Sequence, residues 1–327
     1  MKIAIFGAGG IGSYLGAALA RQGADVTLIC RGAHLAAIRQ HGLRVVGTAG
    51  DFSVDNLRAT DDPGAVGEVD VIISCVKLYD LAAVTPSMLP MIGAGTMVIP
   101  IQNGVTAHEE IAAVVGREHV LGGTVFMSSF IREPGVVELK SEQASITFGE
   151  LQGGISPRVQ AFAQLCESAG IRAHAARDIL IELWHKFIML GGTAALCCLS
   201  RQSIGVIRSD AHLRSLLLQA MQEVLTLAQA KQVSVDGSFI AEAMQFTDKV
   251  HPATKVSMLE DIEAGKPLEL EWITGHIVRE AQAAGVATPI NDIAYACTHL
   301  LAAGATSVQR QLPRRMNPAI PTLLEST

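Results

Sequence analysis

The chain has 327 residues and is rich in aliphatic side chains, with 49% hydrophobic but only 4% aromatic residues. Its length favours about two domains, each with an aliphatic core. The formal net charge is -6 and no basic stretch lies beside aromatic residues. We therefore expect no nucleic-acid partner.

The start of the chain and its cysteines predict where the protein works. The chain begins with a strand-like run, MKIAIFG, so no signal peptide is expected. Apolar runs such as VIISCV and MVIPI are too short to span a bilayer, and no membrane association is expected. Six cysteines are scattered without a CxxC pair, which is typical of free thiols in a reducing compartment. A cytoplasmic location follows as the default.

The first half alternates short β-rich runs with helical stretches, a pattern that predicts a mostly parallel, doubly wound sheet. The expected strands are Lys2–Phe6, Asp25–Cys30, Val69–Cys75, Thr96–Pro100 and Val120–Phe126.

A glycine-rich turn, GAGGIG, follows the first strand directly and opens a helix. Within a strand–helix–strand unit, Gly7 allows the tight turn, Gly9 lets the backbone approach a pyrophosphate, and Gly12 lets the helix pack on the strand. The helix N-terminus then faces the phosphates. The sequence therefore predicts a Rossmann domain that binds a dinucleotide through Gly7, Ala8, Gly9, Gly10, Ile11 and Gly12.

The residue at the end of the second strand predicts which dinucleotide is bound. NAD enzymes place an acidic residue there for the ribose 2′-hydroxyl. Here the segment reads LICRGAH, and Arg31 occupies that place, whereas Asp25 lies at the opposite end of the strand. A 2′-phosphate is the better partner for Arg31, so the sequence favours NADP.

Polar residues follow two later strands, at the sheet edge where ligands bind in open α/β folds. Lys77 follows one strand in SCVKLYD, and Gln102, Asn103 and Gly104 follow the next in IPIQNGV. We expect Lys77 and Asn103 at the cofactor edge. The histidines show no metal-ligand spacing, and no metal site is predicted.

After two alternating runs separated by Pro134-Gly135, the segment Glu138–Phe148 predicts closing, antiparallel strands. The chain then becomes helical. The expected helices are Ile179–Leu199, Ala211–Gln232, Asp236–Lys249, Lys255–Ala264, Leu268–Ala284 and Ile290–Ala303. We expect an NADP-binding Rossmann domain at residues 1–176, an all-helical substrate and dimerisation domain at 177–304, and an irregular, proline-containing tail at 305–327.

These motifs resemble the ketopantoate reductase (2-dehydropantoate 2-reductase) family over nearly the whole chain, up to about Ala303. The resemblance rests on GAGGIG, Arg31, Val76-Lys77 and the QNG of residues 102–104. Further along, it rests on ELWHKF at Glu182–Phe187 and SMLEDIEAGKPLELEWITG at Ser257–Gly275. It implies a Rossmann domain followed by an all-α domain, with the active site in the cleft between them. The implied reaction is reduction of a 2-oxo acid by NADPH, from ketopantoate to pantoate in pantothenate biosynthesis.

The resemblance also implies roles for individual residues. Lys186 would be the general acid, delivering a proton to the substrate carbonyl oxygen as hydride arrives. Glu269 would orient the substrate's far hydroxyl, and Ser257 would assist at the carboxylate. Lys77 and Asn103 would lie near the nicotinamide and the substrate. The alternatives are a lysine whose amine reaches solvent along an apolar helix, and a solvated helix glutamate. His185 points away from Lys186 and is interpreted as structural.

The chain departs from the family in its substrate half. Asn residues usual one and two turns after the lysine are Leu190 and Ala194 here, and another usual Asn is Thr254. A buried substrate hydroxyl facing Leu190 would lack a partner, at a cost of roughly 1–3 kcal/mol. We expect either a rearranged pocket, in which Thr254 contacts the substrate, or a more apolar 2-oxo acid than ketopantoate.

Two other functions fit parts of the pattern. Dehydrogenases of 3-hydroxy acids share a Rossmann domain, a helical domain and a catalytic lysine on the first long helix. A catalytically silent NADP-binding sensor would account for the missing asparagines, although Lys186 and Glu269 are retained. The apolar helices after Ala211 could pack a homodimer or pack on one another.

Overall fold

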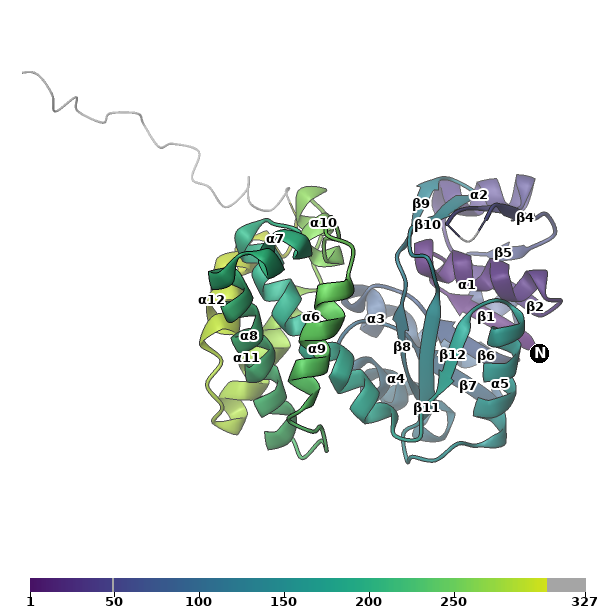
Figure 1. The fold of residues 1–327 in the computed structure, drawn as a ribbon. Helices are drawn as coiled ribbons and strands as arrows, with labels where there is room; N and C mark the ends of the chain where they lie inside the picture. The colour runs from purple at the N-terminus through teal and green to yellow at the C-terminus, as the bar shows by residue number, and fades with distance from the viewer. Residues whose placement is uncertain (49, 305–327) are drawn as a thin grey trace, which may run out of the picture.

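The computed structural model describes residues 1–48 and 50–304, and the expected tail at 305–327 lies outside the described residues. The chain forms an α/β half, built from β1–β12 and α1–α5, and a helical half, built from α6–α12. The two halves lie side by side (Figure 1). This order agrees with the expected Rossmann part followed by an all-helical part.

A five-stranded parallel sheet forms the centre of the α/β half, in the order β5-β2-β1-β6-β7. Ala4 of β1 pairs with Thr27 of β2 on one side and with Ile72 of β6 on the other. Because helices cover both faces, aliphatic residues such as Ile3 and Ile5 are fully buried. The prediction of a parallel sheet is confirmed. Its strands are β1 (Lys2–Phe6), β2 (Asp25–Ile29), β5 (Arg58–Thr60), β6 (Val69–Ser74) and β7 (Ile92–Pro100).

Five helices accompany this sheet, and several short 3₁₀ turns join the elements. The α-helices are α1 (Gly10–Arg21), α2 (Gly32–His41), α3 (Leu78–Val84), α4 (Ala107–Val115) and α5 (Pro157–Ser168). The 3₁₀ helices of this half are η1 (Pro63–Ala65), η2 (Thr85–Met91) and η3 (Arg117–His119).

Two smaller sheets flank the parallel one, in the orders β4-β3-β10-β9 and β12-β11-β8. The hairpin expected around Pro134-Gly135 is β9–β10 and is antiparallel. The expectation for Glu138–Phe148 is only half right, because β10 also runs parallel to β3, and β11 parallel to β12. The strands are β3 (Leu43–Gly47), β4 (Phe52–Val54), β8 (Leu121–Phe126), β9 (Ser129–Glu133), β10 (Val136–Leu139), β11 (Ser145–Glu150) and β12 (Arg172–Ala175).

Strand β8 differs from its prediction. The sequence predicts it in the parallel sheet, but it pairs antiparallel with β11, and an isolated bridge from Val98 of β7 reaches Val120, the residue before β8. Gly123 explains how close β8 still comes, since a Cβ there would lie 2.7 Å from both the Pro100 carbonyl oxygen and a methyl of Ile99. Strand β8 therefore lies close to the parallel sheet, although it is hydrogen-bonded to β11 in a different sheet.

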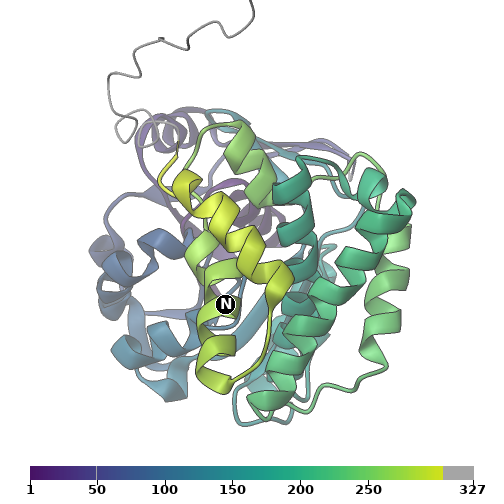
Figure 2. The same ribbon diagram turned by 90° about the vertical axis from the view of Figure 1, so that its left-hand side faces the viewer.

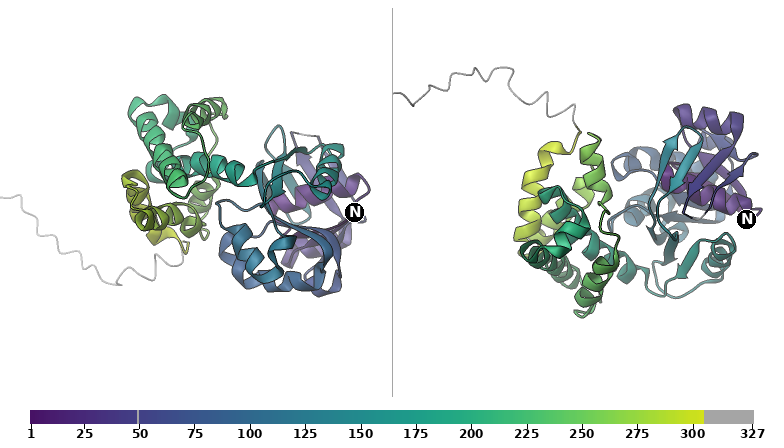
Figure 3. Two further views of the ribbon diagram at one scale, coloured as in Figure 1. Left: turned by 90° about the horizontal axis from the view of Figure 1, so that it is seen from below. Right: turned by 45° about the horizontal axis from the view of Figure 1, so that its top comes forward.

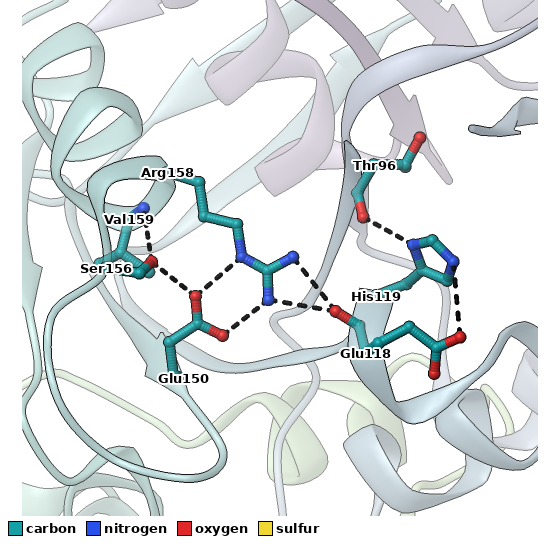
Figure 4. Close-up of polar contacts among 7 residues, drawn as sticks. All are labelled: Thr96, Glu118, His119, Glu150, Ser156, Arg158 and Val159. Carbon is teal, nitrogen blue, oxygen red and sulfur yellow. Dashed lines mark hydrogen bonds and ion pairs between the residues drawn. The ribbon is translucent and has the colours of Figure 1, made fainter. Parts of the chain in front are cut away.

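A polar cluster ties β11 to the start of α5 and to the 3₁₀ turn η3, which precedes β8 (Figure 4). Arg158 at the start of α5 donates to both carboxylate oxygens of Glu150, at 2.8 and 2.7 Å, and to the Glu118 carbonyl at 3.1 Å. Ser156 adds a 2.6 Å hydrogen bond to Glu150. These donors hold the pKa of Glu150 below its usual value. The cluster therefore holds β11, the neighbour of β8, against the η3 turn.

The helical half is built around α6 (Ile179–Ser200), whose first turn is capped by Asp178. α6 packs against α8 and α12, and its N-terminal part reaches into the α/β half, where Ile179 lies against Gly122 of β8 (Figure 3). Figure 2 shows α12, α11 and α8 across the outer face of this half. The other helices are α7 (Ile204–Ser209), α8 (Ala211–Ala230), α9 (Phe239–Lys249), α10 (Ser257–Glu263), η4 (Leu270–Trp272), α11 (Thr274–Ala284), α12 (Pro289–Thr298) and η5 (His299–Leu301).

Two expectations about these helices are corrected. The helix expected over Leu268–Ala284 is broken, since a 3₁₀ turn and the non-helical Ile273 precede α11. The break brings the Trp272 carbonyl close to Gly104, where a Cβ would lie only 3.1 Å from it. By length and composition alone, α6 could cross a membrane, which the expectation of only short apolar runs overlooked. Its packing inside the helical half accounts for that apolar character, because 56% of the window is buried.

Candidate active site

The glycine-rich turn has the geometry that its sequence predicts. Gly7 has a φ of +95°, a conformation that glycine adopts readily. A Cβ at Gly12 would lie 2.6 Å from the Gly7 carbonyl oxygen and 2.9 Å from Ile5, so α1 can sit on β1 only with glycine there. A Cβ at Gly9 would meet nothing within 4 Å. Gly9 therefore borders open space at the start of α1, where a phosphate group would fit.

Gly10 is required for a reason that the sequence did not indicate. A Cβ there would lie 2.2 Å from the Ser129 carbonyl oxygen, because β9 runs directly against the turn. Ser129 also donates its hydroxyl to the Gly10 carbonyl at 3.1 Å. The β9–β10 hairpin thus forms one side of the predicted dinucleotide site.

A buried chain of hydrogen bonds holds the turn in place. The Gly135 N–H donates to Nδ1 of His34 at 3.1 Å, so Nε2 carries the ring proton and faces the Ser13 hydroxyl at 3.1 Å. Ser13 in turn donates to the Ala8 carbonyl at 3.0 Å. Burial lowers the pKa of His34, which matches the neutral tautomer that this chain requires.

Arg31 follows β2 after Cys30 and lies immediately before α2, as predicted. Its side chain is 88% exposed and forms a long ion pair, 4.0 Å, with the carboxylate of Asp80 in the first turn of α3. Exposed pairs of this kind contribute little, so the guanidinium can exchange Asp80 for an anion at this edge of the sheet. Asp25 is engaged elsewhere, in an ion pair with Arg58.

Lys77 brings the two halves of the protein together. Its ammonium donates to Asp261 of α10 at 2.9 Å and to Glu269 at 3.3 Å. Glu269 also accepts the backbone N–H of Leu78 at 3.0 Å. Burial alone would lower the pKa of Lys77, but the two carboxylates outweigh it and the pKa is raised. The pair places a cation and a buried carboxylate at the carboxyl end of β6.

The alternative interpretation of Glu269 as a solvated helix residue is wrong, since only 6% of the residue is exposed. Sequence reasoning missed Asp261, the closer of the two partners of Lys77. Asp261 lies within the motif Ser257–Gly275, one helical turn after Ser257, and this spacing could have indicated that the two residues share one face of the helix.

Lys186 lies on the side of α6 that faces β8. Its ammonium donates to the Val125 carbonyl at 2.8 Å and lies 5.4 Å from the centre of the Phe126 ring. Burial lowers the pKa of Lys186 to about 8, against the opposing effect of the Glu269 carboxylate. The residue is half-buried, and the hydrogen bond holds its amine against the end of β8. His185 stacks on Phe239 with ring centres 3.9 Å apart, which agrees with its structural interpretation.

The remaining predicted substrate residues lie on three segments. Asn103 is half-buried after β7, beside Gln102, whose amide donates to Ser74 at 2.8 Å and to the Val76 carbonyl at 3.2 Å. Thr254 is half-buried, and Ser257 is exposed at the first position of α10. Within the described part of the chain, none of the three side chains hydrogen-bonds Lys186 or Glu269.

The two positions that depart from the family differ in exposure. Leu190 is half-buried, one turn beyond Lys186 on α6, and presents no hydrogen-bond donor. Ala194 is fully buried in the core of the helical half. Residues 1–48 and 50–304 contain no group of three His, Cys, Asp or Glu side chains that could hold a metal ion.

Comparisons with known proteins match both halves of the chain. The family model "Ketopantoate reductase PanE/ApbA" matches residues 3–153, and the model of its C-terminal part matches residues 178–302. The chain is 30% identical over 291 residues to a 2-dehydropantoate 2-reductase of Pyrococcus abyssi, covering 89% of this chain and 94% of the relative. It is 26% identical to the uncharacterized oxidoreductase YkpB of Bacillus subtilis, covering 90% and 97%. The solved 2-dehydropantoate 2-reductase of Porphyromonas gingivalis superposes with a TM-score of 0.80 at 32% identity, covering 91% and 99%.

Proposed function

Because the chain belongs to the ketopantoate reductase family, oxidoreductases acting on CH–OH groups, we propose that it reduces a 2-oxo acid to a 2-hydroxy acid with NADPH. The observation that carries the proposal is the ion pair of Lys77 and Glu269 between the halves, with Lys186 near enough for the charge of Glu269 to raise its pKa. Lys77 leaves the sheet edge beside the predicted cofactor site, Glu269 contacts it from the helical half, and the electrostatic field of Glu269 reaches Lys186.

The residues present fit a phosphorylated dinucleotide. The open space at Gly9 lies at the N-terminus of α1, which suits a pyrophosphate. The exposed Arg31 suits a 2′-phosphate, because the position that is acidic in NAD enzymes carries a guanidinium here. When bound, the reduced nicotinamide supplies the hydride. We propose that Gly7 to Gly12, Arg31, Lys77 and Asn103 hold this cofactor.

Lys186 is proposed as the general acid. At neutral pH, an amine with a pKa of about 8 is mostly protonated yet gives up its proton readily. The Val125 carbonyl takes one N–H, and two remain for the substrate carbonyl oxygen. As hydride reaches the carbonyl carbon, negative charge grows on that oxygen, and Lys186 transfers its proton there to complete the hydroxyl.

Other residues are proposed to orient the substrate. Glu269 accepts from the Lys77 ammonium and from the Leu78 N–H, and we propose that it holds Lys77 in place beside the substrate. Asn103, Thr254 and Ser257 supply polar groups for the substrate carboxylate. The relatives' names favour ketopantoate or a related branched 2-oxo acid as substrate. We further propose a Rossmann domain over 1–176 and a substrate domain over 177–304, in a cytoplasmic enzyme.

A steady-state screen of 2-oxo acids with NADPH and with NADH tests this function. We expect NADPH oxidation with at least one branched 2-oxo acid, a higher kcat/KM with NADPH than with NADH, and loss of most of kcat in Lys186→Ala. Lys231→Ala is the matched control, because Lys231 lies on the surface in an ion pair with Glu280 and such pairs contribute little. Near-full turnover by Lys186→Ala, or reaction only with 3-hydroxy acids, would contradict the proposal.

A further inference from the structure

Two phenylalanines expose their rings where the halves of the protein meet. Phe126 is the last residue of β8, and Phe246 lies on α9 of the helical half. Their ring centres are 5.7 Å apart, and the rings meet edge to face at 62°. Phe126 is 38% exposed and Phe246 is 47% exposed, and the chain's other phenylalanines are buried or half-buried. Exposing two large rings on facing elements loses the stabilisation that their burial would give, unless a ligand covers them.

The rings lie beside the proposed acid. Lys186 donates to the carbonyl of Val125, the residue directly before Phe126, and its ammonium lies 5.4 Å from the centre of the Phe126 ring. A substrate carbonyl that accepts from Lys186 therefore lies within a few ångströms of that ring. The substituent on the carbonyl carbon can then reach the pair formed by Phe126 and Phe246, which we name the aromatic wall.

The aromatic wall is held in place from the helical side. Phe239, two turns before Phe246 on the same face of α9, stacks on His185 of α6 with ring centres 3.9 Å apart. His185 is the neighbour of Lys186 in sequence, so this stack fixes α9 against the helix that carries the acid. Met189 and Leu190, one turn beyond Lys186, are half-buried and apolar. Leu190 and the two rings offer no hydrogen-bond donor or acceptor, and Met189 offers only a weakly accepting sulfur.

Resting on the proposed function, we propose that the aromatic wall binds the substituent of the 2-oxo acid and selects an apolar one, branched or aromatic, without a hydroxyl. An apolar substituent gains by leaving water for the two rings. A hydroxyl in the same place loses its water partners and finds no replacement on the wall. Phe126 and Phe246 are thus residues that determine specificity rather than residues that transfer a proton.

A matched set of substrates tests the proposal, with NADPH as the reductant. Trimethylpyruvate and ketopantoate share the branched carbon but differ by the hydroxyl. Phenylglyoxylate carries an aromatic ring, and pyruvate has only a methyl group. We expect kcat/KM for trimethylpyruvate or phenylglyoxylate to exceed that for ketopantoate by about 10-fold or more, the discrimination that a hydrophobic pocket gives.

Two substitutions remove the rings one at a time. Phe246→Ala and Phe126→Ala should each lower kcat/KM for the preferred bulky substrate by about 10-fold. The value for pyruvate should change less than about 3-fold, because its methyl group is too short to use the wall. Phe246→Leu, which keeps an apolar side chain, should recover most of the loss. Ile293→Ala, on the exposed surface of α12, is the control and should behave as wild type.

The outcomes separate this inference from the proposed function. If ketopantoate is reduced fastest, or if the ring variants lower all substrates equally, the aromatic wall does not select the substituent, although the reductase function stands. If no 2-oxo acid is reduced while the protein is folded, the proposed function fails and the inference fails with it.

Discussion

The pH dependence of reduction reports directly on Lys186, because this residue must be protonated to act as the acid. Burial places its pKa at about 8, whereas a solvated lysine titrates near 10.4. The protonated form is the active one, so activity is present below about pH 8 and is lost as the pH rises through that value. A lysine in water would still be almost fully protonated there.

The size of the loss follows from the pKa. With a midpoint of about 8, the protonated fraction falls from about 0.9 at about pH 7 to about 0.1 at about pH 9, so we expect a decline of about 10-fold. An unperturbed lysine would lose less than about one-tenth over the same range. The assay is the initial rate of NADPH oxidation, expressed as kcat/KM for the preferred 2-oxo acid at saturating NADPH.

Two variants identify the titrating group. Lys186→Arg keeps a charge that does not titrate in this range, so whatever activity it retains should be flat from about pH 7 to about pH 9. Glu269→Gln removes the carboxylate that raises the pKa of Lys186, so the midpoint should move to lower pH. An activity that stays constant to about pH 10 in wild type would refute the assignment, as would a Lys186→Arg profile with the same midpoint as wild type.

Four further predictions concern the cofactor side. Arg31→Ala should lower kcat/KM for NADPH by about 10-fold and leave kcat/KM for NADH unchanged, since a hydrogen bond to a charged group contributes roughly 1.5–3 kcal/mol. Equal losses with both cofactors would contradict a 2′-phosphate contact. Gly9→Ala, whose Cβ meets no protein atom, should melt like wild type but bind NADPH more weakly. Gly12→Ala should lose roughly 1–3 kcal/mol of folding stability in a denaturant titration, because its Cβ would lie 2.6 Å from backbone. Burial lowers the pKa of His34, so the unfolded state binds a proton at this residue more readily, and the stability that His34 contributes is lost as the pH falls below about 6.5. In melting curves recorded against pH, His34→Gln should lose less stability over this range than wild type does. An acid profile that is the same in the variant would show that other groups cause the loss.

Local patterns in the sequence were enough to predict the parallel sheet and the long helices. β1 has the predicted bounds, and α6 differs only at its last residue, because buried parallel strands and core helices leave continuous apolar runs. Strand β8 shows the limit of this reasoning. Its apolar run predicts a strand but not its neighbours, and the close approach of its glycines to Pro100 and Ile179 exists only in the folded chain. The break at Ile273, which brings the Trp272 carbonyl close to Gly104, likewise leaves no local pattern in the sequence.

In the candidate site, too, residues close together in sequence could be predicted, and residues brought together by the fold could not. Gly7, Gly9 and Gly12 lie in one short turn, so their spacing in sequence is their spacing in space. Asp261 and the aromatic wall could not be found in this way. Asp261 meets Lys77 across 184 positions of sequence, and Phe126 meets Phe246 across the two halves. An exposed ring and a buried one look alike in a sequence, so exposure had to come from the fold.

The departures seen in the sequence and the rings seen in the structure are independent observations of one property. Leu190 offers no donor at the position, one turn after the lysine, where the family resemblance leads us to expect an asparagine. Phe126 and Phe246 come from other elements and add apolar surface on the side of Lys186 that faces β8. A rearranged pocket that kept the usual substrate would need a donor to replace the missing ones, but these neighbours of Lys186 supply none. The burial of Lys186 lowers the pKa of the acid toward neutrality, and the proposed aromatic wall adds an apolar surface beside it that we expect to disfavour a substituent with a hydroxyl.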